Sequence, residues 1–336
     1  MATAVPMTLD SAADLIDLSI QKIVKKTTNL SKLNIHETVF YSQTTEDYYE
    51  KDSSLSGFGE ADRITEGAVL SAESPVQGFD RTYTQEFFGK MATFTTHEWR
   101  FGIKKRKLEN VVSDLDGTIR RKRERILTEY VENSMGANTT YTVTDGKGNY
   151  SKSVLGGDGK AAINNAHTRE DGGSTWNNVV YDGTTYNMDF APDAIEAMYR
   201  TASLIRDPKG NLMNIDPDTF ICRKGSALQF EMERINGAVA KNFAPNSAEN
   251  NGKPFGTFKT IYLPYLTTSA AAYYWFMDSS MKSDTCGFQY RESQGPSIDA
   301  PEKDYKTKNI YVSSTAFFDY GHNDARCLIG STGANA

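Results

Sequence analysis

The most suggestive group of metal-ligating residue types is His167 with Glu170 and Asp171, in the segment AHTREDGG. A histidine and two carboxylates could hold a divalent cation that activates water for hydrolysis. A metal site, however, needs ligands that converge with a defined geometry. One histidine beside two acids in a glycine-rich stretch is more typical of solvated surface. A metal hydrolase is therefore a minor alternative, which metal analysis of the purified protein would test.

The other short motifs do not predict catalysis. DGKGN at 145–149 and GGDGK at 156–160 resemble fragments of calcium loops. The longer ligand ladder and flanking helices of an EF-hand are absent, so we interpret both as tight turns. Gly57-Phe58-Gly59 is too short for a dinucleotide fingerprint, and neither GxSxG nor a P-loop occurs. The sequence thus predicts no catalytic residue, no cofactor and no metal ion.

Composition and charge narrow the class of protein. The chain has 336 residues, 38% of them hydrophobic, and a net charge of −6. Its three cysteines are widely spaced and have neither the spacing of a zinc site nor that of a secreted disulfide framework. No stretch approaches 18 consecutive apolar residues, and no basic segment precedes an apolar run at the N-terminus. We therefore expect no membrane span, no signal peptide and a reducing cytoplasmic environment.

A basic cluster in TIRRKRER at 118–125 could contact nucleic acid. Its members are Arg120, Arg121, Lys122, Arg123 and Arg125. A solvated helix face is the favoured interpretation, because the chain as a whole is acidic and nucleic-acid binders usually concentrate positive charge. A milder alternative is an inner surface that faces DNA without reading its sequence.

The sequence predicts both helices and strands, which must position these residues. Apolar spacing of three and four predicts a helix about 40 Å long over 104–134, which is the clearest pattern in the chain. The remaining predicted helices span 8–26, 189–206 and 225–238. Strands are predicted at 83–101, in a hairpin around Asp145-Gly146, twice within 258–278, at 309–320 and at 325–331.

The first ninety residues do not look able to fold alone. Residues 54–82 are rich in glycine, serine and acids, and a connection this long is rare in a compact domain. Interspersed aromatic residues argue against simple disorder, so we expect a loop ordered by a partner. The candidates for inter-subunit contact are Phe40, Tyr41, Tyr48, Tyr49, Leu55, Phe58, Ile64 and Leu70.

Five strings, in this order, resemble segments of the major capsid proteins of tailed bacteriophages, the Mu-like branch in particular. They are SGFGEADRITEGAVL, GGDGKAAINNAHTREDGGSTWNN, GNLMNIDPDTFICRKG, TIYLPYLTTSAAAYYWFMD and FFDYGHNDARCLIGS. One departure is that Thr168 follows His167 where the family pattern has proline. The resemblance covers about residues 8–331.

The resemblance implies an α+β, Hong Kong 97-type capsid fold. Its parts would be an N-terminal arm at 1–40 and an extended β-hairpin loop at 41–85. A peripheral domain would comprise 86–140 and 290–336, with a spine helix at 104–134, and an axial α/β domain would comprise 141–289. No pattern in the sequence supports a covalent cross-link.

The resemblance also implies a structural function without enzymatic activity. Many copies would self-assemble as pentamers and hexamers into an icosahedral shell around double-stranded DNA, in the virion, after assembly in the host cytoplasm. Portal, scaffold or decoration proteins are possible further partners, and no membrane is implied. The alternatives are an encapsulin-like compartment and a β-rich adhesin or binding protein. The long helix at 104–134 argues against the adhesin.

Overall fold

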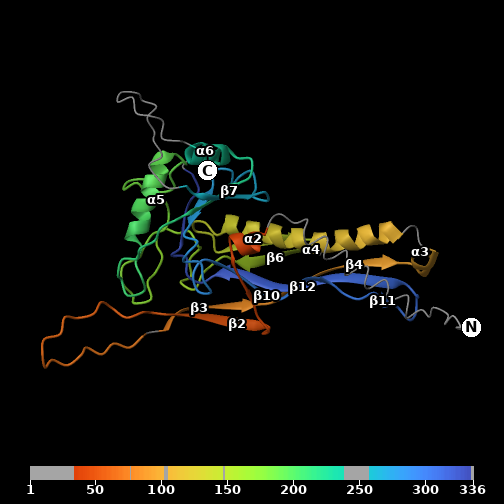
Figure 1. Cartoon of the computed structure of the whole chain (residues 1–336), viewed down its shortest axis with the longest axis horizontal. Coiled ribbons are helices and arrows are strands. Elements are labelled where there is room, and N and C mark those ends of the chain that lie inside the picture. Colours follow the sequence, from red (N-terminus) through yellow and green to blue (C-terminus); the bar gives the residue numbers. More distant parts are fainter. Residues whose placement is uncertain (1–33, 76, 102–104, 147, 238–256, 334–336) are drawn as a thin grey trace, which may run out of the picture.

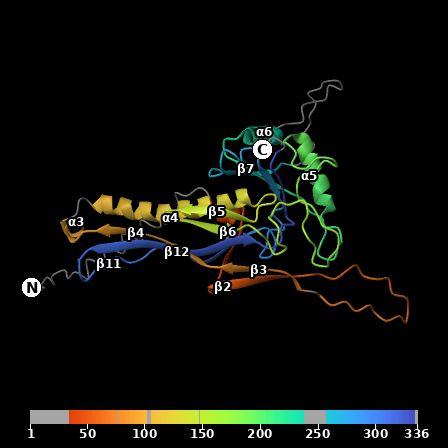
Figure 2. The same ribbon diagram turned by 180° about the vertical axis from the view of Figure 1, so that it is seen from behind.

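The computed structural model describes residues 34–75, 77–101, 105–146, 148–237 and 257–333. Figure 1 shows an elongated α+β molecule. A long helix lies along a sheet on one side, a second body of sheet and helices stands at one end of it, and a two-stranded loop extends beyond that end. Figure 2 shows the same arrangement from behind.

The larger sheet contains β1 (Tyr41–Thr44), β4 (Glu86–Phe94), β10 (Phe288–Ile298), β11 (Glu302–Lys303) and β12 (Ile310–His322). β12 is its central strand, because it pairs antiparallel with β10, β11 and β4. β1 adds in parallel to β10. Buried and partly exposed residues alternate along β12 from Ile310 to Phe318, as expected for a strand with one face in the core.

The long helix α4 (Lys105–Asn133) covers the buried face of this sheet. Its fully buried residues include Ile126, Leu127 and Tyr130, which lie in one cluster with Phe288 of β10 and Phe318 of β12. Tyr130 is the centre of this cluster, because its ring contacts those of Phe288 and Tyr320. The helix is therefore stabilised mainly by packing its apolar stripe on the sheet.

Two glycines offer a test of this packing. A Cβ at Gly117, within α4, would meet nothing within 4 Å, whereas a Cβ at Gly330, in β13 (Leu328–Ser331), would lie 3.1 Å from Ile163 and Met135 and 3.2 Å from the Tyr274 carbonyl oxygen. We expect Gly117→Ala to stabilise the fold by about 0.5–1 kcal/mol, because glycine is a poor helix former. Gly330→Ala should destabilise it by about 1–3 kcal/mol through overpacking. Urea unfolding of both variants measures the two changes, and a destabilising Gly117→Ala would contradict the open environment.

The smaller sheet has the order β13 (Leu328–Ser331), β9 (Tyr274–Met277), β7 (Thr219–Arg223) and β8 (Lys259–Leu263). β9 is antiparallel to both neighbours, and β7 is parallel to β8. Helices α5 (Pro192–Leu204) and α6 (Ala227–Gly237) pack beside it around a second apolar cluster. The end of the described chain thus connects the two sheets, because β12 lies in the larger sheet and β13, which follows it, pairs with β9 in the smaller sheet.

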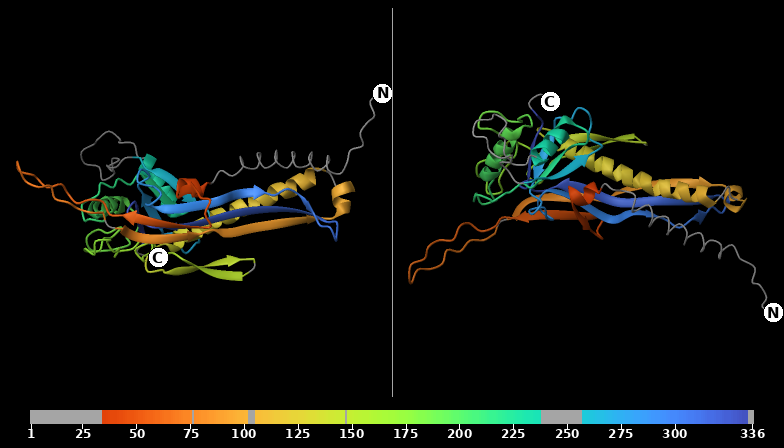
Figure 3. Two further views of the ribbon diagram at one scale, coloured as in Figure 1. Left: turned by 90° about the horizontal axis from the view of Figure 1, so that it is seen from below. Right: turned by 45° about the horizontal axis from the view of Figure 1, so that its top comes forward.

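Six shorter elements complete the described part of the structure. Helix α2 (Ile35–Thr38) packs against α4, and α3 (Thr96–Phe101) precedes α4 in the chain. β5 (Thr140–Asp145) and β6 (Gly148–Ser153) form a hairpin that projects to one side of the molecule (Figure 3). β2 (Tyr49–Leu55) and β3 (Gln77–Thr84) form the two-stranded stem of the extended loop.

Most predicted elements are confirmed. The helices at 104–134, 189–206 and 225–238, the hairpin at Asp145-Gly146 and the strands within 258–278 and 309–331 all occur with small shifts of their ends. The helix predicted at 8–26 lies outside the described residues.

Two predictions need correction. The single strand at 83–101 is wrong, because β3 ends at Thr84, β4 ends at Phe94, and α3 follows. The 11-residue strand β10 was not predicted, because polar residues, Gly295 and Pro296 interrupt its alternating pattern. The division into domains stays a prediction. The structure adds that β1 lies in the larger sheet and that β13 lies in the smaller one.

Candidate functional site

The tip of the extended loop is the most exposed part of the described chain. Every residue from 57 to 75 is exposed. The side chains include Phe58, 61% exposed, Leu70, 72% exposed, and Val69, 93% exposed. Figures 1 and 3 show the loop extending well beyond the body of the molecule. Several large apolar side chains on one projecting segment indicate a surface that another molecule covers.

Hydrogen bonds give the tip a defined course. The Gly59 amide donates to Glu73 Oε2 at 2.8 Å, and the Ser71 hydroxyl donates to Asp62 Oδ2 at 2.8 Å. Lys209, in the turn after α5, contacts Glu73 Oε1 at 2.5 Å. Hydrogen bonds from Lys209 and from the Gly59 amide lower the pKa of Glu73. The tip is therefore ordered by polar contacts within it and by one ion pair with the body, while its apolar side chains stay in solvent.

A buried aromatic residue attaches the stem of the loop to the larger sheet. The ring of Tyr83, in β3, is fully buried near two guanidinium groups: that of Arg291 lies 4.8 Å from its centroid and that of Arg81 lies 5.4 Å from it. Arg291 also forms an ion pair with Glu50 of β2 and lies 3.8 Å from Asp52. Burial, the largest effect, raises the pKa of Asp52, although Arg291 opposes this. The stem is thus held by charged groups in a desolvated environment, where each depends on its partner.

The end of the stem also contacts the end of β12. The Thr84 amide donates to Asp319 Oδ2 at 2.8 Å, and Asp319 forms an ion pair with Lys152 of β6. Arg81 donates to the carbonyl oxygen of Leu155. A Cβ at Gly157 would lie 2.8 Å from Cβ of Phe79 in β3. The loop therefore leaves the body from a closely packed base.

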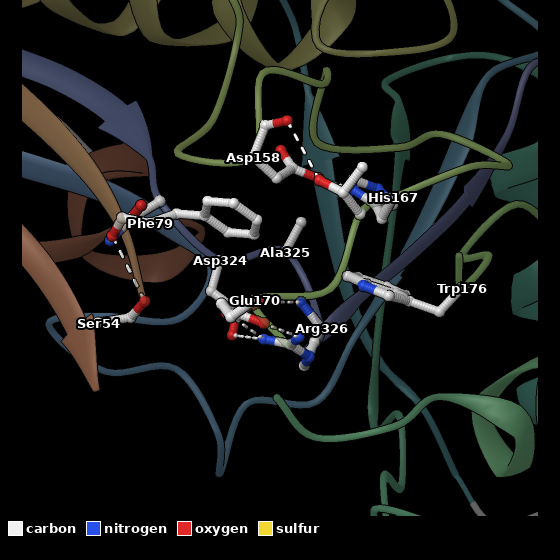
Figure 4. Close-up of a pocket in the computed structure, with 11 residues that line it drawn as sticks. Ser54, Phe79, Asp158, His167, Glu170, Trp176, Asp324, Ala325 and Arg326 are labelled. Atoms are coloured by element: carbon white, nitrogen blue, oxygen red, sulfur yellow. Dashed lines mark hydrogen bonds and ion pairs between the residues drawn. The ribbon is translucent and has the colours of Figure 1, made fainter. Parts of the chain in front are cut away.

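A compact polar junction lies beside this base (Figure 4). His167 Nδ1 is 2.6 Å from Asp158, and His167 stacks on Trp176 with ring centroids 4.3 Å apart. Arg326 donates to Glu170 Oε2 at 2.9 Å and lies 5.3 Å from the centroid of Trp176. The remaining cavity is about 10 Å³, enough for about one water molecule. The junction is a structural contact with no room for a substrate.

The sequence candidates for metal binding lie apart in this junction. Glu170 pairs with Arg326, Asp171 pairs with Arg169, and His167 bonds to Asp158 and Asn178. No group of three metal-ligating side chains occurs among the residues that the structure describes. Within the same part of the chain, no helix is long and apolar enough to cross a membrane.

Most inter-subunit candidates lie on exposed surface. Tyr48, Tyr49, Leu55, Phe58, Ile64 and Leu70 are well exposed and Tyr41 is partly exposed. The choice of Phe40 as a contact candidate needs correction, because its side chain is fully buried in its own chain, with its ring against those of Phe288 and Tyr130. The reason is that α2 is fixed to α4, where Glu124 accepts a hydrogen bond from the Ile35 amide at 2.8 Å. Phe40, which follows α2, therefore lies in the core.

The predicted basic cluster does not form one surface. Arg123 is buried beside Glu124 and Tyr290, and Arg120 pairs with the buried Asp116. Lys122 and Arg125 both donate to the Thr144 carbonyl oxygen of β5, which leaves Arg121 pointing to solvent. Successive residues of a helix point about 100° apart, so a run of basic residues is distributed around the axis. A DNA-facing role for these residues stays a prediction, and it does not apply to Arg123.

Sequence reasoning missed Tyr83, Arg291 and Arg326, which hold the loop and its junction. Their partners lie far away in the sequence: Arg291 contacts residue 50, and Arg326 contacts residue 170. Tyr83 and Arg326 lie in segments that were predicted as strands, whereas Arg291 lies in β10, which was not predicted.

A buried histidine in the same region predicts a pH dependence. His322 Nδ1 lies 2.7 Å from the Tyr130 hydroxyl, and burial, together with Arg81, lowers the pKa of His322 to about 3. The unfolded histidine titrates near 6.5, so below that pH the unfolded state binds a proton that the folded state refuses. Stability is full well above pH 6.5 and should fall by about 1.5 kcal/mol between pH 6.5 and pH 5.

Urea unfolding at both pH values measures this loss. His322→Gln should remove its share of the slope, whereas His97→Gln serves as a control at an exposed position. An unchanged slope in His322→Gln would show that other groups cause the pH dependence.

Comparisons with protein-family models and with curated proteins give no match. The structure is similar to solved structures that include phage capsids. The asymmetric unit of the bacteriophage PhiM1 mature capsid is 10% identical, with a TM-score of 0.49 over 89% of this chain and 86% of that one. The capsid of a native GTA particle is 11% identical, with a TM-score of 0.48 over 88% of both chains. A chain of Mycobacterium phage Bobi is 12% identical, with a TM-score of 0.46 over 89% of this chain and 90% of that one.

Proposed function

We propose that this chain is the major capsid protein of a tailed bacteriophage, with a Hong Kong 97-type fold. In this proposal, it self-assembles as pentamers and hexamers into an icosahedral shell that encloses double-stranded DNA. The observation that carries the proposal is the extended loop, in which a two-stranded stem packed on the body presents an exposed apolar tip that extends beyond it.

Contact between copies explains the tip physically. Burying an apolar side chain contributes about 1.5–3 kcal/mol, so Phe58, Val69 and Leu70 together would supply much of a contact's stability. A loop from one copy that lies on a different surface of the next copy is a heterologous contact, and such contacts close into rings. Each copy would then both give and receive a loop.

In this proposal, the other elements would supply the remaining parts of such a subunit. The larger sheet with α4 would form the peripheral domain and its spine helix, and the smaller sheet with α5 and α6 would form the axial domain. A net charge of −6 would limit adhesion to the packaged DNA. The role would be structural, in the virion, after assembly in the host cytoplasm, with portal, scaffold or decoration proteins as further partners.

Expression of the intact chain tests the proposal. We expect closed polyhedral particles of uniform size in negative-stain electron microscopy, and a mass of many subunits in light scattering. A protein that stays monomeric across concentrations and with scaffold components added would contradict it. Particles that enclose an enzyme rather than DNA in the native source would instead support the encapsulin-like alternative.

A further inference from the structure

One turn beside the smaller sheet reaches the tip of the extended loop. Lys209, in the turn at 207–211 that follows α5, has its Nζ 2.5 Å from Glu73 Oε1. The other oxygen of the same carboxylate accepts a hydrogen bond from the Gly59 amide at 2.8 Å. Glu73 thereby joins both arms of the tip to the body. Among the residues that the structure describes, no other ion pair connects positions 57–75 to the rest of the chain.

Hydrogen bonds hold the 207–211 turn in one conformation. Asp207 Oδ1 accepts the amide of Lys209 at 2.9 Å and that of Asn211 at 2.8 Å. The Gly210 amide donates to the Asp207 carbonyl oxygen at 3.0 Å, and the guanidinium of Arg206 donates to the Gly210 carbonyl oxygen at 2.7 Å. The φ of Gly210 is +93°, which favours glycine. Lys209 is therefore carried by a rigid turn.

Arg169 attaches this turn to a neighbouring segment. Its side chain is 10% exposed and lies against two glycines: a Cβ at Gly173 would lie 2.7 Å from its guanidinium carbon, and a Cβ at Gly210 would overlap the guanidinium. The next residue, Glu170, supports the stem, because a Cβ at Gly78 of β3 would lie 3.2 Å from Glu170 Cγ. Two adjacent residues thus support both the turn and the stem, so the body holds the loop at two points.

We propose that Lys209 is a positioning residue, which sets the direction of the loop in the free subunit so that the tip is presented to the next copy already in place. The identity of that partner rests on the proposed function, whereas the contact belongs to the single chain. Without this contact, the nineteen residues of the tip would sample many directions about the end of the stem. Binding would then include the entropy loss of ordering them, which a tip held at Glu73 has partly undergone beforehand.

The charges of the pair make the contact sensitive to salt. The side chain of Lys209 is 18% exposed and that of Glu73 is 43% exposed, so counterions reach the pair. Ion pairs of this kind contribute little to the stability of a whole protein. The position of the tip, however, is a small equilibrium of its own. Loss of the pair should lower the ratio of held to released tips about 2- to 5-fold.

A distance measurement in the intact chain tests the proposal. Nitroxide labels at Ala68→Cys in the tip and Ser203→Cys in α5 occupy exposed positions, and the three native cysteines are buried. Double electron–electron resonance below the assembly concentration gives the distribution of distances between tip and body. We expect a narrow distribution at low salt that broadens in about 0.5 M sodium chloride, because salt screens the pair.

Three variants make the test specific to the charge at position 209. Lys209→Gln should broaden the distribution at low salt, remove its salt dependence and raise the concentration needed for assembly about 2- to 5-fold. Lys209→Arg keeps the charge and should keep the narrow distribution. Lys303→Gln, at an exposed position in β11, is the matched control and should leave both the distribution and assembly unchanged.

Four results would overturn the proposal. They are a broad distribution in the native chain at low salt, an equally narrow one in Lys209→Gln, a loss in Lys209→Arg as large as in Lys209→Gln, and an unchanged assembly concentration despite a broadened distribution. The distances are measured in the free subunit. A chain that never forms particles would therefore contradict the proposed function, while the distance distributions would still show whether Lys209 positions the loop.

Discussion

Replacing residues 57–75 with a short Gly-Ser-Gly linker is expected to abolish particle formation while the subunit stays folded. All nineteen replaced positions are exposed, and Glu73–Lys209 is the one ion pair that the described part of the tip makes with the body. The stem keeps its buried Tyr83 and its ion pairs, so the Tm should change by less than about 2 °C. Gel filtration with light scattering and negative-stain microscopy measure the outcome.

A finer variant separates the apolar contribution from loop length. Phe58, Val69 and Leu70 changed together to serine should raise the concentration needed for assembly at least 100-fold, because each lost burial is worth about 1.5–3 kcal/mol. Leu204→Ser and Tyr305→Ser are matched controls, because both side chains are exposed and lie off the loop. Normal particles from the linker variant would refute the role of the tip. Equal losses in the controls would point to general surface hydrophobicity instead.

Arg326→Ala is expected to cause the largest loss of stability of any single change outside the apolar core. The guanidinium is 3% exposed and bonds to Glu170, to Asp324 at 2.6 Å and to the Arg206 carbonyl oxygen at 2.8 Å. Its removal leaves the carboxylate of Glu170, 4% exposed, without its positive partner. Losing one member of a buried pair costs about 3–5 kcal/mol.

Chemical unfolding with two probes measures this loss. Arg121→Ala is the control: its side chain is 61% exposed, and the change should cost no more than about 0.5 kcal/mol. Arg326→Ala together with Glu170→Ala should recover part of the loss, because the unpaired charge is then gone. A loss in Arg326→Ala as small as in Arg121→Ala would show that the junction contributes little.

Local patterns predicted the elements whose causes are local. The spacing of Leu115, Ile119, Ile126 and Tyr130 predicts α4, and Asp145-Gly146 predicts the β5–β6 hairpin. The strand β10 escaped prediction because its alternation is broken by Gly295 and Pro296, and its pairing with β12 has register shifts at those positions. Neighbouring strands, distant in sequence, decide such a strand.

The sequence by itself determined that this chain carries a long amphipathic helix, a mixed set of strands, and an acidic, aromatic-containing loop too thin in apolar residues to form a core. Composition and periodicity determine these features, because they depend on neighbours a few residues apart. Only the tertiary structure decided that Phe40 is buried against Phe288, that Arg123 is buried against Tyr290, and that Arg291 lies over Tyr83 at the base of the loop. Those arrangements join residues tens to hundreds of positions apart, and the burial that fixes each charge and ring exists only when both segments are in place.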